Sequence, residues 1–156
     1  MKYRRIFESG HSYYFTLVTY RRKPYLVEYI DQLREAFRHS KIRYDYKIDA
    51  IVVLPDHLHM IITPKCVQQY PEIIKQIKRS FVYNLPSNVK QAAKLELSHP
   101  QYKRGYSGIW QSRYYEHVIR NEKDFYEKMQ YIQNNPVKHG LCKPYNTWKY
   151  SSFYHA

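Results

Sequence analysis

Residues 46–63 constrain the possible folds of this chain more than any other segment. They are rich in apolar side chains and are interrupted by Pro55-Asp56. Proline followed by aspartate favours a turn, and apolar and β-branched residues lie on both sides, so this stretch predicts an antiparallel β-hairpin. Side chains alternate faces along a strand, so His57 and His59 share one face of the second strand. That face must therefore carry two imidazoles, while the apolar residues between and after them point to the opposite face.

The spacing of apolar residues predicts the other elements. We expect strands at about 12–20, 46–54, 57–63 and 110–119, and helices at about 27–40, 71–81 and 121–134. Pro136 is expected to end the last helix, and residues 86–108 are expected to be irregular apart from a short helix over 89–97. The order β-α-β-β-α-β is that of the ferredoxin-like unit. We therefore predict an α+β fold with a ferredoxin-like antiparallel sheet, a C-terminal helix and an extended tail, in a single domain spanning 1–156. The first two helices would cover one sheet face and leave the other for a ligand, with the last helix near it.

The charge balance indicates a nucleic-acid partner. The chain has 26 Lys and Arg against 13 Asp and Glu, for a net charge of +13. It also has 19 tyrosines, whose rings can stack on unpaired bases while basic residues follow the phosphate backbone. No apolar run is long enough for a membrane span, no signal peptide is recognisable, and the two cysteines form no Cys-x-x-Cys pair. We expect a cytoplasmic, nucleoid-associated protein with no membrane partner.

Three residue types suggest phosphoryl chemistry. Two imidazoles on one strand face supply half of a divalent-metal site, although the spacing alone also fits ordinary half-buried histidines. Tyr131 and Asn135 lie four residues apart on the last predicted helix and so share a face. A tyrosine hydroxyl is mostly protonated at neutral pH, so it can attack a phosphate only if the phosphate is made electrophilic, for example by a metal. The alternative for Tyr131 is a ring packed on the sheet.

Several segments resemble single-tyrosine transposases that carry a His-hydrophobic-His motif (HUH transposases). The resemblance is to the REP-associated tyrosine transposase branch and covers nearly the whole chain. It rests on three longer blocks in the right order, VVLPDHLH at 52–59, WQSRYYEH at 110–117 and YIQNNPVKHG at 131–140, and on shorter matches at 3–7 and 148–152. Residues 86–105 match nothing in this branch.

The resemblance implies a metal-dependent enzyme that cuts and rejoins single-stranded DNA near a hairpin, with Mg²⁺ or Mn²⁺ as the metal. In this sequence His57 and His59 match the metal-binding histidines, Asn135 the third, amide ligand, and Tyr131 the nucleophile that becomes joined to the 5′ phosphate. In the resembling branch the N-terminal residues lie near the hairpin foot. The basic residues that we predict to contact DNA are Arg4, Arg5, Arg21, Arg22, Lys23, Lys75, Lys78 and Arg79.

Other readings stay open at this point. A ferredoxin-like nucleic-acid-binding module without chemistry would have the same strand order, charge and aromatic content, although the RNP1 pattern of RNA-binding sheets is absent. A replication-initiation or plasmid-mobilising nuclease would share the two histidines and the tyrosine, although such chains are usually longer. Related transposases include dimers that exchange the tyrosine helix, so both a monomer and a homodimer are compatible with the sequence.

Overall fold

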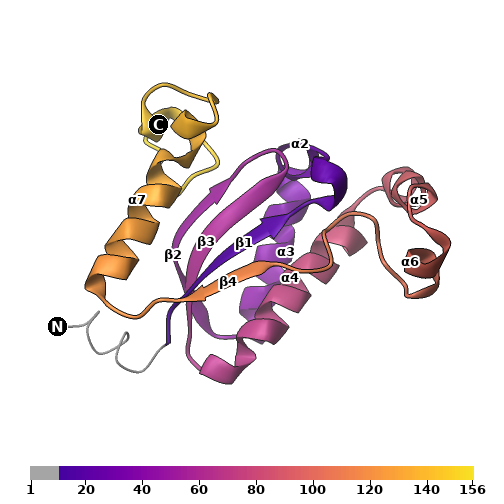
Figure 1. The fold of residues 1–156 in the computed structure, drawn as a ribbon, viewed down its shortest axis with the longest axis horizontal. Coiled ribbons are helices and arrows are strands. Elements are labelled where there is room, and N and C mark those ends of the chain that lie inside the picture. The colour runs from indigo at the N-terminus through magenta and orange to yellow at the C-terminus, as the bar shows by residue number, and fades with distance from the viewer. Residues whose placement is uncertain (1–10) are drawn as a thin grey trace.

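A four-stranded antiparallel sheet, in the order β2-β3-β1-β4, forms the centre of the molecule (Figure 1). The computed structural model describes residues 11–156. The helices and strands, in chain order, are β1 Tyr13–Val18, α2 Tyr25–Glu28, α3 Ile30–Arg43, β2 Tyr46–Val53, β3 His57–Pro64, α4 Tyr70–Asn84, α5 Ser87–Leu95, α6 His99–Lys103, β4 Tyr115–Val118 and α7 Glu122–Lys138. This strand order and the two helices between the strands confirm the ferredoxin-like prediction.

The hairpin predicted around Pro55-Asp56 is present. Strands β2 and β3 pair antiparallel with Val52 opposite His59, and the amide of Leu54 donates to the carbonyl of His57 across the turn at 2.8 Å. β1 lies on the other side of β3, with Thr16 opposite His59. The two histidines therefore stand on a central strand, where neighbouring strands fix the backbone on both sides.

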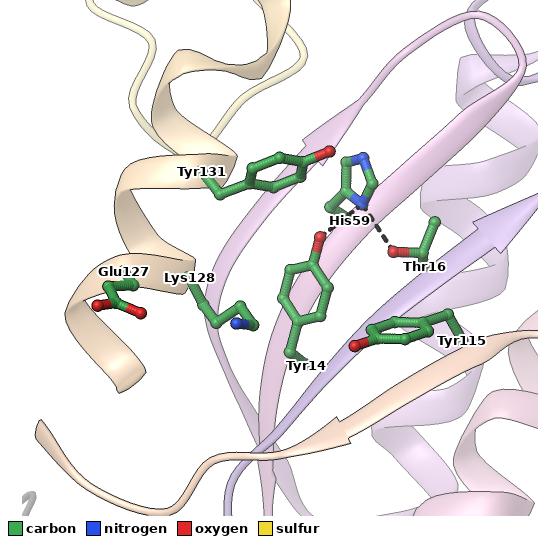
Figure 2. Close-up of a pocket in the computed structure, with 7 residues that line it drawn as sticks. All are labelled: Tyr14, Thr16, His59, Tyr115, Glu127, Lys128 and Tyr131. Atoms are coloured by element: carbon green, nitrogen blue, oxygen red, sulfur yellow. Dashed lines mark hydrogen bonds between the residues drawn. The ribbon is translucent and has the colours of Figure 1, made fainter. Parts of the chain in front are cut away.

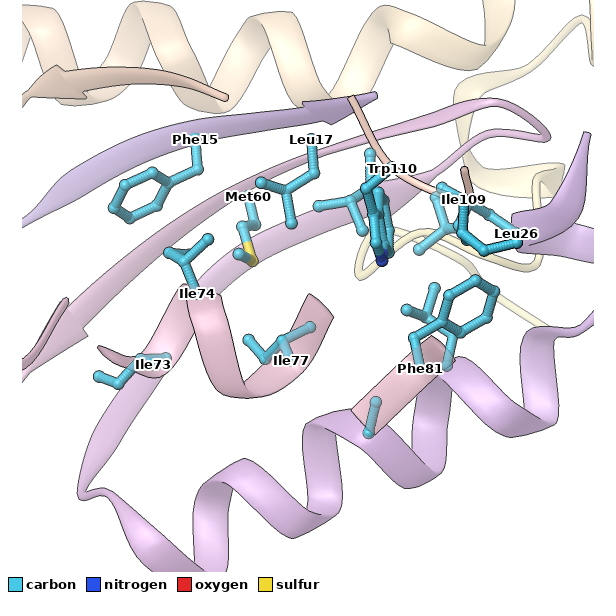
Figure 3. Packing of buried hydrophobic residues seen from close by; sticks show 14 of the residues in the cluster. Phe15, Leu17, Leu26, Met60, Ile73, Ile74, Ile77, Phe81, Ile109 and Trp110 are labelled. Atoms are coloured by element: carbon cyan, nitrogen blue, oxygen red, sulfur yellow. The ribbon is translucent and has the colours of Figure 1, made fainter. Parts of the chain in front are cut away.

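One face of the sheet packs against α3 and α4 (Figure 3). Met60 and Leu58 of β3 point to this face, as the alternation predicted, and meet Phe15 and Leu17 of β1. The apolar stripe of α4 closes the layer with Ile73, Ile74, Ile77 and Phe81, all fully buried. Burying side chains of this size contributes roughly 1.5–3 kcal/mol each before the entropy of folding is subtracted.

Helix α7 packs on the opposite face. Phe125 and Ile132 of this helix join Tyr14, Val52 and Ile61 of the strands in a second, smaller cluster. His57 and His59 belong to this face, so the last helix lies over part of the surface that the sequence left for a ligand. None of the helices over residues 11–156 combines the length and apolar character that a bilayer span needs.

The prediction that Pro136 ends the last helix is wrong. Asn121 caps the start as expected, because its Oδ1 accepts the amide of Asp124 at 2.8 Å, but the helix runs through a buried Pro136 to Lys138. A proline removes one backbone hydrogen bond, which a helix held by packing tolerates. The helix is terminated by Gly140, which has a φ of +71°. The amide of Leu141 donates to the Pro136 carbonyl at 2.9 Å in a Schellman motif.

Two further predictions need correction. Residues 86–108 are not mainly irregular. α5 is the short helix predicted over 89–97, found two residues earlier, and α6 is an additional helix that begins with a capping box between Ser98 and Gln101. The fourth strand is only Tyr115–Val118, with one isolated bridge between Trp110 and Thr19. The indole of Trp110 packs on Phe81 and donates to the Lys78 carbonyl of α4, so Trp110 is held against this helix and does not continue the strand.

The tail covers part of the edge strand β2 of its own chain. Ser151 forms a bridge with Val52, the amide of Val53 donates to the Tyr150 carbonyl at 2.8 Å, and the indole of Trp148 donates to the Val53 carbonyl at 2.8 Å. This pairing satisfies backbone groups that an open sheet edge would leave free.

Candidate active site

His57 and His59 form a buried pair on the face of β3 that α7 covers. Each is 5% exposed, and their ring centroids are 4.9 Å apart with the planes nearly perpendicular. The one-residue spacing on a flat strand produces this arrangement, since both side chains must leave the same face.

Each imidazole is held through its Nδ1 atom. The Nδ1 of His57 lies 2.6 Å from a carboxylate oxygen of Asp56, which therefore accepts its proton. The Nδ1 of His59 lies 2.9 Å from the hydroxyl of Tyr14 and 2.8 Å from that of Thr16. Both sets of partners can accept a proton from Nδ1, and with the proton there each Nε2 atom keeps the lone pair through which histidine binds a metal.

Burial keeps the two imidazoles neutral. It lowers the pKa of His59 to about 3, and the neighbouring His57, His139, Lys138 and Arg22 lower it further. Burial also lowers the pKa of His57, although the Asp56 carboxylate opposes this shift. Both rings are therefore available as uncharged nitrogen ligands at neutral pH.

Tyr131 and Asn135 of α7 and His139 just after it follow one another at a spacing of four residues, and so lie on one side of the helix. Tyr131 stands against His59 with ring centroids 5.2 Å apart, and His139, which follows the helix, stands against His57 at 5.1 Å. Asn135 lies midway between them along the helix and is 1% exposed. The predicted residues His57, His59, Tyr131 and Asn135 thus come together from two elements.

Unsatisfied polar atoms identify the place where a metal fits. Among the described residues, three buried side-chain atoms lack a hydrogen-bond partner, namely Nε2 of His59 and both Oδ1 and Nδ2 of Asn135. Orphaned buried polar atoms are rare and call for an unseen partner such as an ion. Within residues 11–156 no three His, Cys, Asp or Glu side chains are grouped closely enough to hold a metal ion by themselves. An amide oxygen from Asn135 is therefore a fitting third ligand beside the two imidazoles.

Tyr131 borders a pocket that opens beside the histidines (Figure 2). Its ring is 40% exposed, and the ammonium of Lys138 lies 5.1 Å from the ring centroid. The pocket has a volume of about 570 Å³, and its walls come from β1, β3, β4 and α7, with Tyr14, Thr16, His59, Tyr115, Glu127, Lys128 and Tyr131 as lining residues. A nucleophile there is reachable by a large substrate.

The loop after β1 brings Arg22 to the other side of the histidine pair. Arg21 and Arg22 have φ values of 54° and 56°, a left-handed conformation that costs side-chain-bearing residues roughly 1–2 kcal/mol each. Thr19 holds the loop, because its buried hydroxyl bonds to the carbonyls of Lys23 and Asp56. The guanidinium of Arg22 reaches within 3.5 Å of the Asp56 carboxylate. Strained backbone of this kind is characteristic of functional sites.

Four of the other predicted DNA contacts, Lys23, Lys75, Lys78 and Arg79, make no hydrogen bond or ion pair with the histidine pair. Lys23 is paired with Glu96 at 2.6 Å. Lys75, Lys78 and Arg79 are on α4, across the sheet from the histidines, and Lys78 donates to the Gln111 carbonyl at 3.0 Å. Arg4 and Arg5 lie outside the described residues.

The sequence did not single out the residues that hold the histidines. Tyr14 and Thr16 alternate along β1 and so share a face, but only the pairing of Thr16 with His59 shows that this face is the histidine face. The sequence pattern predicts only a turn at Asp56 and no role for His139. The spacing of four residues from Tyr131 to Asn135 and on to His139 is a signal that could have identified the latter.

Comparison with known proteins assigns the family. The family model described as "Transposase IS200 like" matches residues 8–135. The chain belongs to the IS200-like transposase family. Two relatives from this family's REP-associated branch match almost end to end, and both are named as REP-associated tyrosine transposases. The protein from Haemophilus influenzae is 39% identical over 97% of this chain and 85% of its own length, and that from Escherichia coli K12 is 33% identical over 98% and 82%.

A solved structure agrees with these relatives. It is described as a REP-associated tyrosine transposase bound to a REP hairpin, and it superposes with a TM-score of 0.72 at 32% identity, over 92% of this chain and 77% of that one. The REP-associated branch predicted from the sequence is therefore confirmed, and with it the assignment as a tyrosine transposase.

Proposed function

We propose that this transposase cuts and rejoins single-stranded DNA beside a hairpin, with Tyr131 as the nucleophile and His57, His59 and Asn135 as the ligands of a divalent metal. The observation that carries the proposal is the set of unsatisfied atoms on His59 and Asn135, one helical turn from Tyr131. A folded core without metal chemistry would have no use for a buried amide that lacks every partner.

The chemical step uses the Tyr131 hydroxyl. Its oxygen attacks the scissile phosphorus, the P–O3′ bond breaks, and the leaving 3′ oxygen takes a proton from water. The products are a tyrosyl 5′-phosphodiester and a DNA strand with a free 3′ hydroxyl. Because Tyr131 is partly exposed, its proton can pass to water, and the nearby Lys138 ammonium favours the negative charge that develops on the phenol oxygen. A bound Mg²⁺ or Mn²⁺ would polarise the phosphate oxygens.

Rejoining reverses the same bonds. A second 3′ hydroxyl attacks the phosphotyrosine, the P–O bond to Tyr131 breaks, and the tyrosine recovers its proton. The energy of the original phosphodiester is kept in the covalent intermediate, so no nucleotide cofactor is needed. Consistent with this, the sequence has no Gly-x-x-x-x-Gly-Lys-Ser/Thr phosphate-binding loop.

A DNA hairpin as the partner is supported by the relative whose structure was solved with a REP hairpin. The net charge of +13 favours such a ligand and predicts that affinity falls steeply with salt. Arg22, placed at the histidine pair, is the cation we expect nearest the cleaved phosphate.

The test is covalent trapping. Protein is incubated with Mn²⁺ and end-labelled hairpin oligonucleotides taken from the DNA flanking its gene, and a denaturing gel is read for a protein–DNA adduct. We expect an adduct with the native protein and with Tyr126→Phe, which changes an exposed tyrosine of the same helix, and none with Tyr131→Phe or in EDTA.

The opposite pattern would favour the module without chemistry. Tight, salt-sensitive binding of every hairpin with no adduct, in a protein whose Tyr131→Phe variant folds and binds equally well, would remove the catalytic role. Loss of folding in Tyr131→Phe would instead assign the Tyr131 hydroxyl a structural role.

A further inference from the structure

We propose that the pocket in Figure 2 binds one unpaired nucleobase of the nucleotide next to the cleaved phosphate, with Tyr115 as the stacking surface. This inference rests on the proposed function and adds a subsite to it. Neither the histidine motif nor the tyrosine motif in the sequence points to Tyr115 as a DNA contact.

The aromatic arrangement is the first support. Tyr14 forms the floor of the pocket and is nearly perpendicular to two other rings, Tyr115 at 6.1 Å and Tyr131 at 6.4 Å. Tyr115 is 56% exposed and begins β4, whereas Tyr114, just before the strand, packs inward on Phe15. An aromatic ring left open beside a nucleophile is a surface on which a base can stack.

The position of the pocket fixes which nucleotide it can receive. Tyr131 and His59 are walls of the pocket and also parts of the site where the phosphate is attacked. A group that enters the pocket must therefore belong to the nucleotide adjoining that phosphate. With a volume of about 570 Å³, the pocket has room for a base and part of its sugar.

The charges favour a base over a phosphate. The one ammonium in the lining, Lys128, is already paired with Asp124 at 3.4 Å and lies 5.8 Å from the centre of the Tyr14 ring. Glu127 adds a carboxylate at the rim, which repels phosphate oxygens. An uncharged aromatic ring suits these walls better, and Lys128 can donate a hydrogen bond to an acceptor on its edge.

A paired base would not fit this role. Bases in a duplex are stacked on both faces, so only an unpaired base can offer a face to Tyr115. The proposal therefore requires the nucleotide next to the cut to be single-stranded.

The test is a double-mutant cycle between protein and DNA. Hairpin oligonucleotides with a single-stranded flank are prepared with an abasic site at each flank position in turn, and affinities are measured in EDTA so that no cleavage occurs. We compare the native protein with Tyr115→Leu, which removes the flat ring, and Tyr115→Phe, which keeps it. Tyr126→Leu, at a tyrosine that is 65% exposed on α7 but outside the pocket, is the matched control.

We expect one flank position at which the abasic site weakens binding of the native protein by about tenfold or more, the loss typical of one stacked base. Tyr115→Leu should show the same loss on intact DNA and no additional loss at that abasic site, whereas Tyr115→Phe and Tyr126→Leu should behave like the native protein. If Tyr115→Leu stays as sensitive to every abasic site as the native protein, the pocket does not bind a base.

The two proposals fail in different ways. If the native protein forms the Tyr131 adduct but no position depends on Tyr115, the base pocket is refuted and the proposed function stands. If the native protein binds no hairpin at all, both proposals are refuted together.

Discussion

Replacing Asn135 by leucine should make the metal-free protein more stable, although it removes a proposed ligand. The amide is 1% exposed and neither of its polar atoms has a partner. Leaving a buried polar group unsatisfied costs about 1–3 kcal/mol, and leucine has a similar size without that penalty. We therefore expect Asn135→Leu to raise the free energy of unfolding in EDTA by about 1–3 kcal/mol, or roughly 2–12 °C in Tm for a chain of this length.

The matched control is the preceding residue. Asn134 is exposed on the same helix, so Asn134→Leu reports the gain of about 0.5 kcal/mol or less that comes from helix propensity alone. The difference between the two variants isolates the cost of the buried amide.

Bound Mn²⁺ should stabilise the native protein more than Asn135→Leu and so remove most or all of the variant's advantage. At a concentration one hundred times its Kd, a bound ion stabilises the native protein by about 2.7 kcal/mol, and a variant without the third ligand should gain much less. Thermal unfolding in EDTA and across a Mn²⁺ titration measures both effects. The idea that Asn135 serves a ligand would be refuted if Asn135→Leu were less stable than Asn134→Leu in EDTA, because the amide would then be structural.

Three further predictions concern residues around the histidine pair. Tyr14→Phe removes a hydroxyl that holds His59, and isothermal titration should show Mn²⁺ affinity reduced by about 10–100-fold; unchanged affinity would leave Thr16 as the sole support. Arg22→Gly removes the strain of a side-chain-bearing residue in the left-handed conformation, so the free energy of unfolding should stay level or rise by up to about 1 kcal/mol while hairpin affinity falls. A clear loss of stability would show that the Arg22 backbone is not strained. The third is a pH dependence. Because burial lowers the pKa of His59 to about 3, the unfolded chain binds the proton first as pH falls below 6.5. Metal-free stability should therefore decrease with falling pH by up to about 1.4 kcal/mol per unit from this residue. When the free energy of unfolding is measured by denaturant titration at several pH values, it should change less with pH in His59→Gln than in the native protein. An equal change would assign the pH dependence to other groups.

Local patterns were sufficient for the hairpin and its two faces. The turn residues, the alternation and the apolar composition act over a few residues, so strand limits at β2 and β3 were predicted almost to the residue. The end of α7 was not, because proline is a weak stop when packing supports the helix, and the glycine that does end it lies four residues later. Helix α6 was missed although Ser98 and Gln101 have capping-box spacing.

The residues of the candidate site likewise divide into those that local patterns predict and those that depend on long-range packing. Strand periodicity placed His57 and His59 together, and helix periodicity placed Tyr131 with Asn135, but bringing the two pairs together depends on how α7 packs on the sheet. Composition could not select Tyr131 among 19 tyrosines, and the family motif did so. The contacts of Tyr14 and Thr16 with His59 depend on strand register across a long stretch of sequence, which no local pattern contains.

The most direct measurement is to identify the amino acid that carries the DNA. The adduct formed with Mn²⁺ and a hairpin oligonucleotide is digested with protease and nuclease, and the modified peptide is sequenced by mass spectrometry. We predict a 5′-phosphotyrosyl bond at Tyr131. A modification at another residue, such as Tyr115 or Tyr126, would contradict the proposed site even if DNA cleavage were observed.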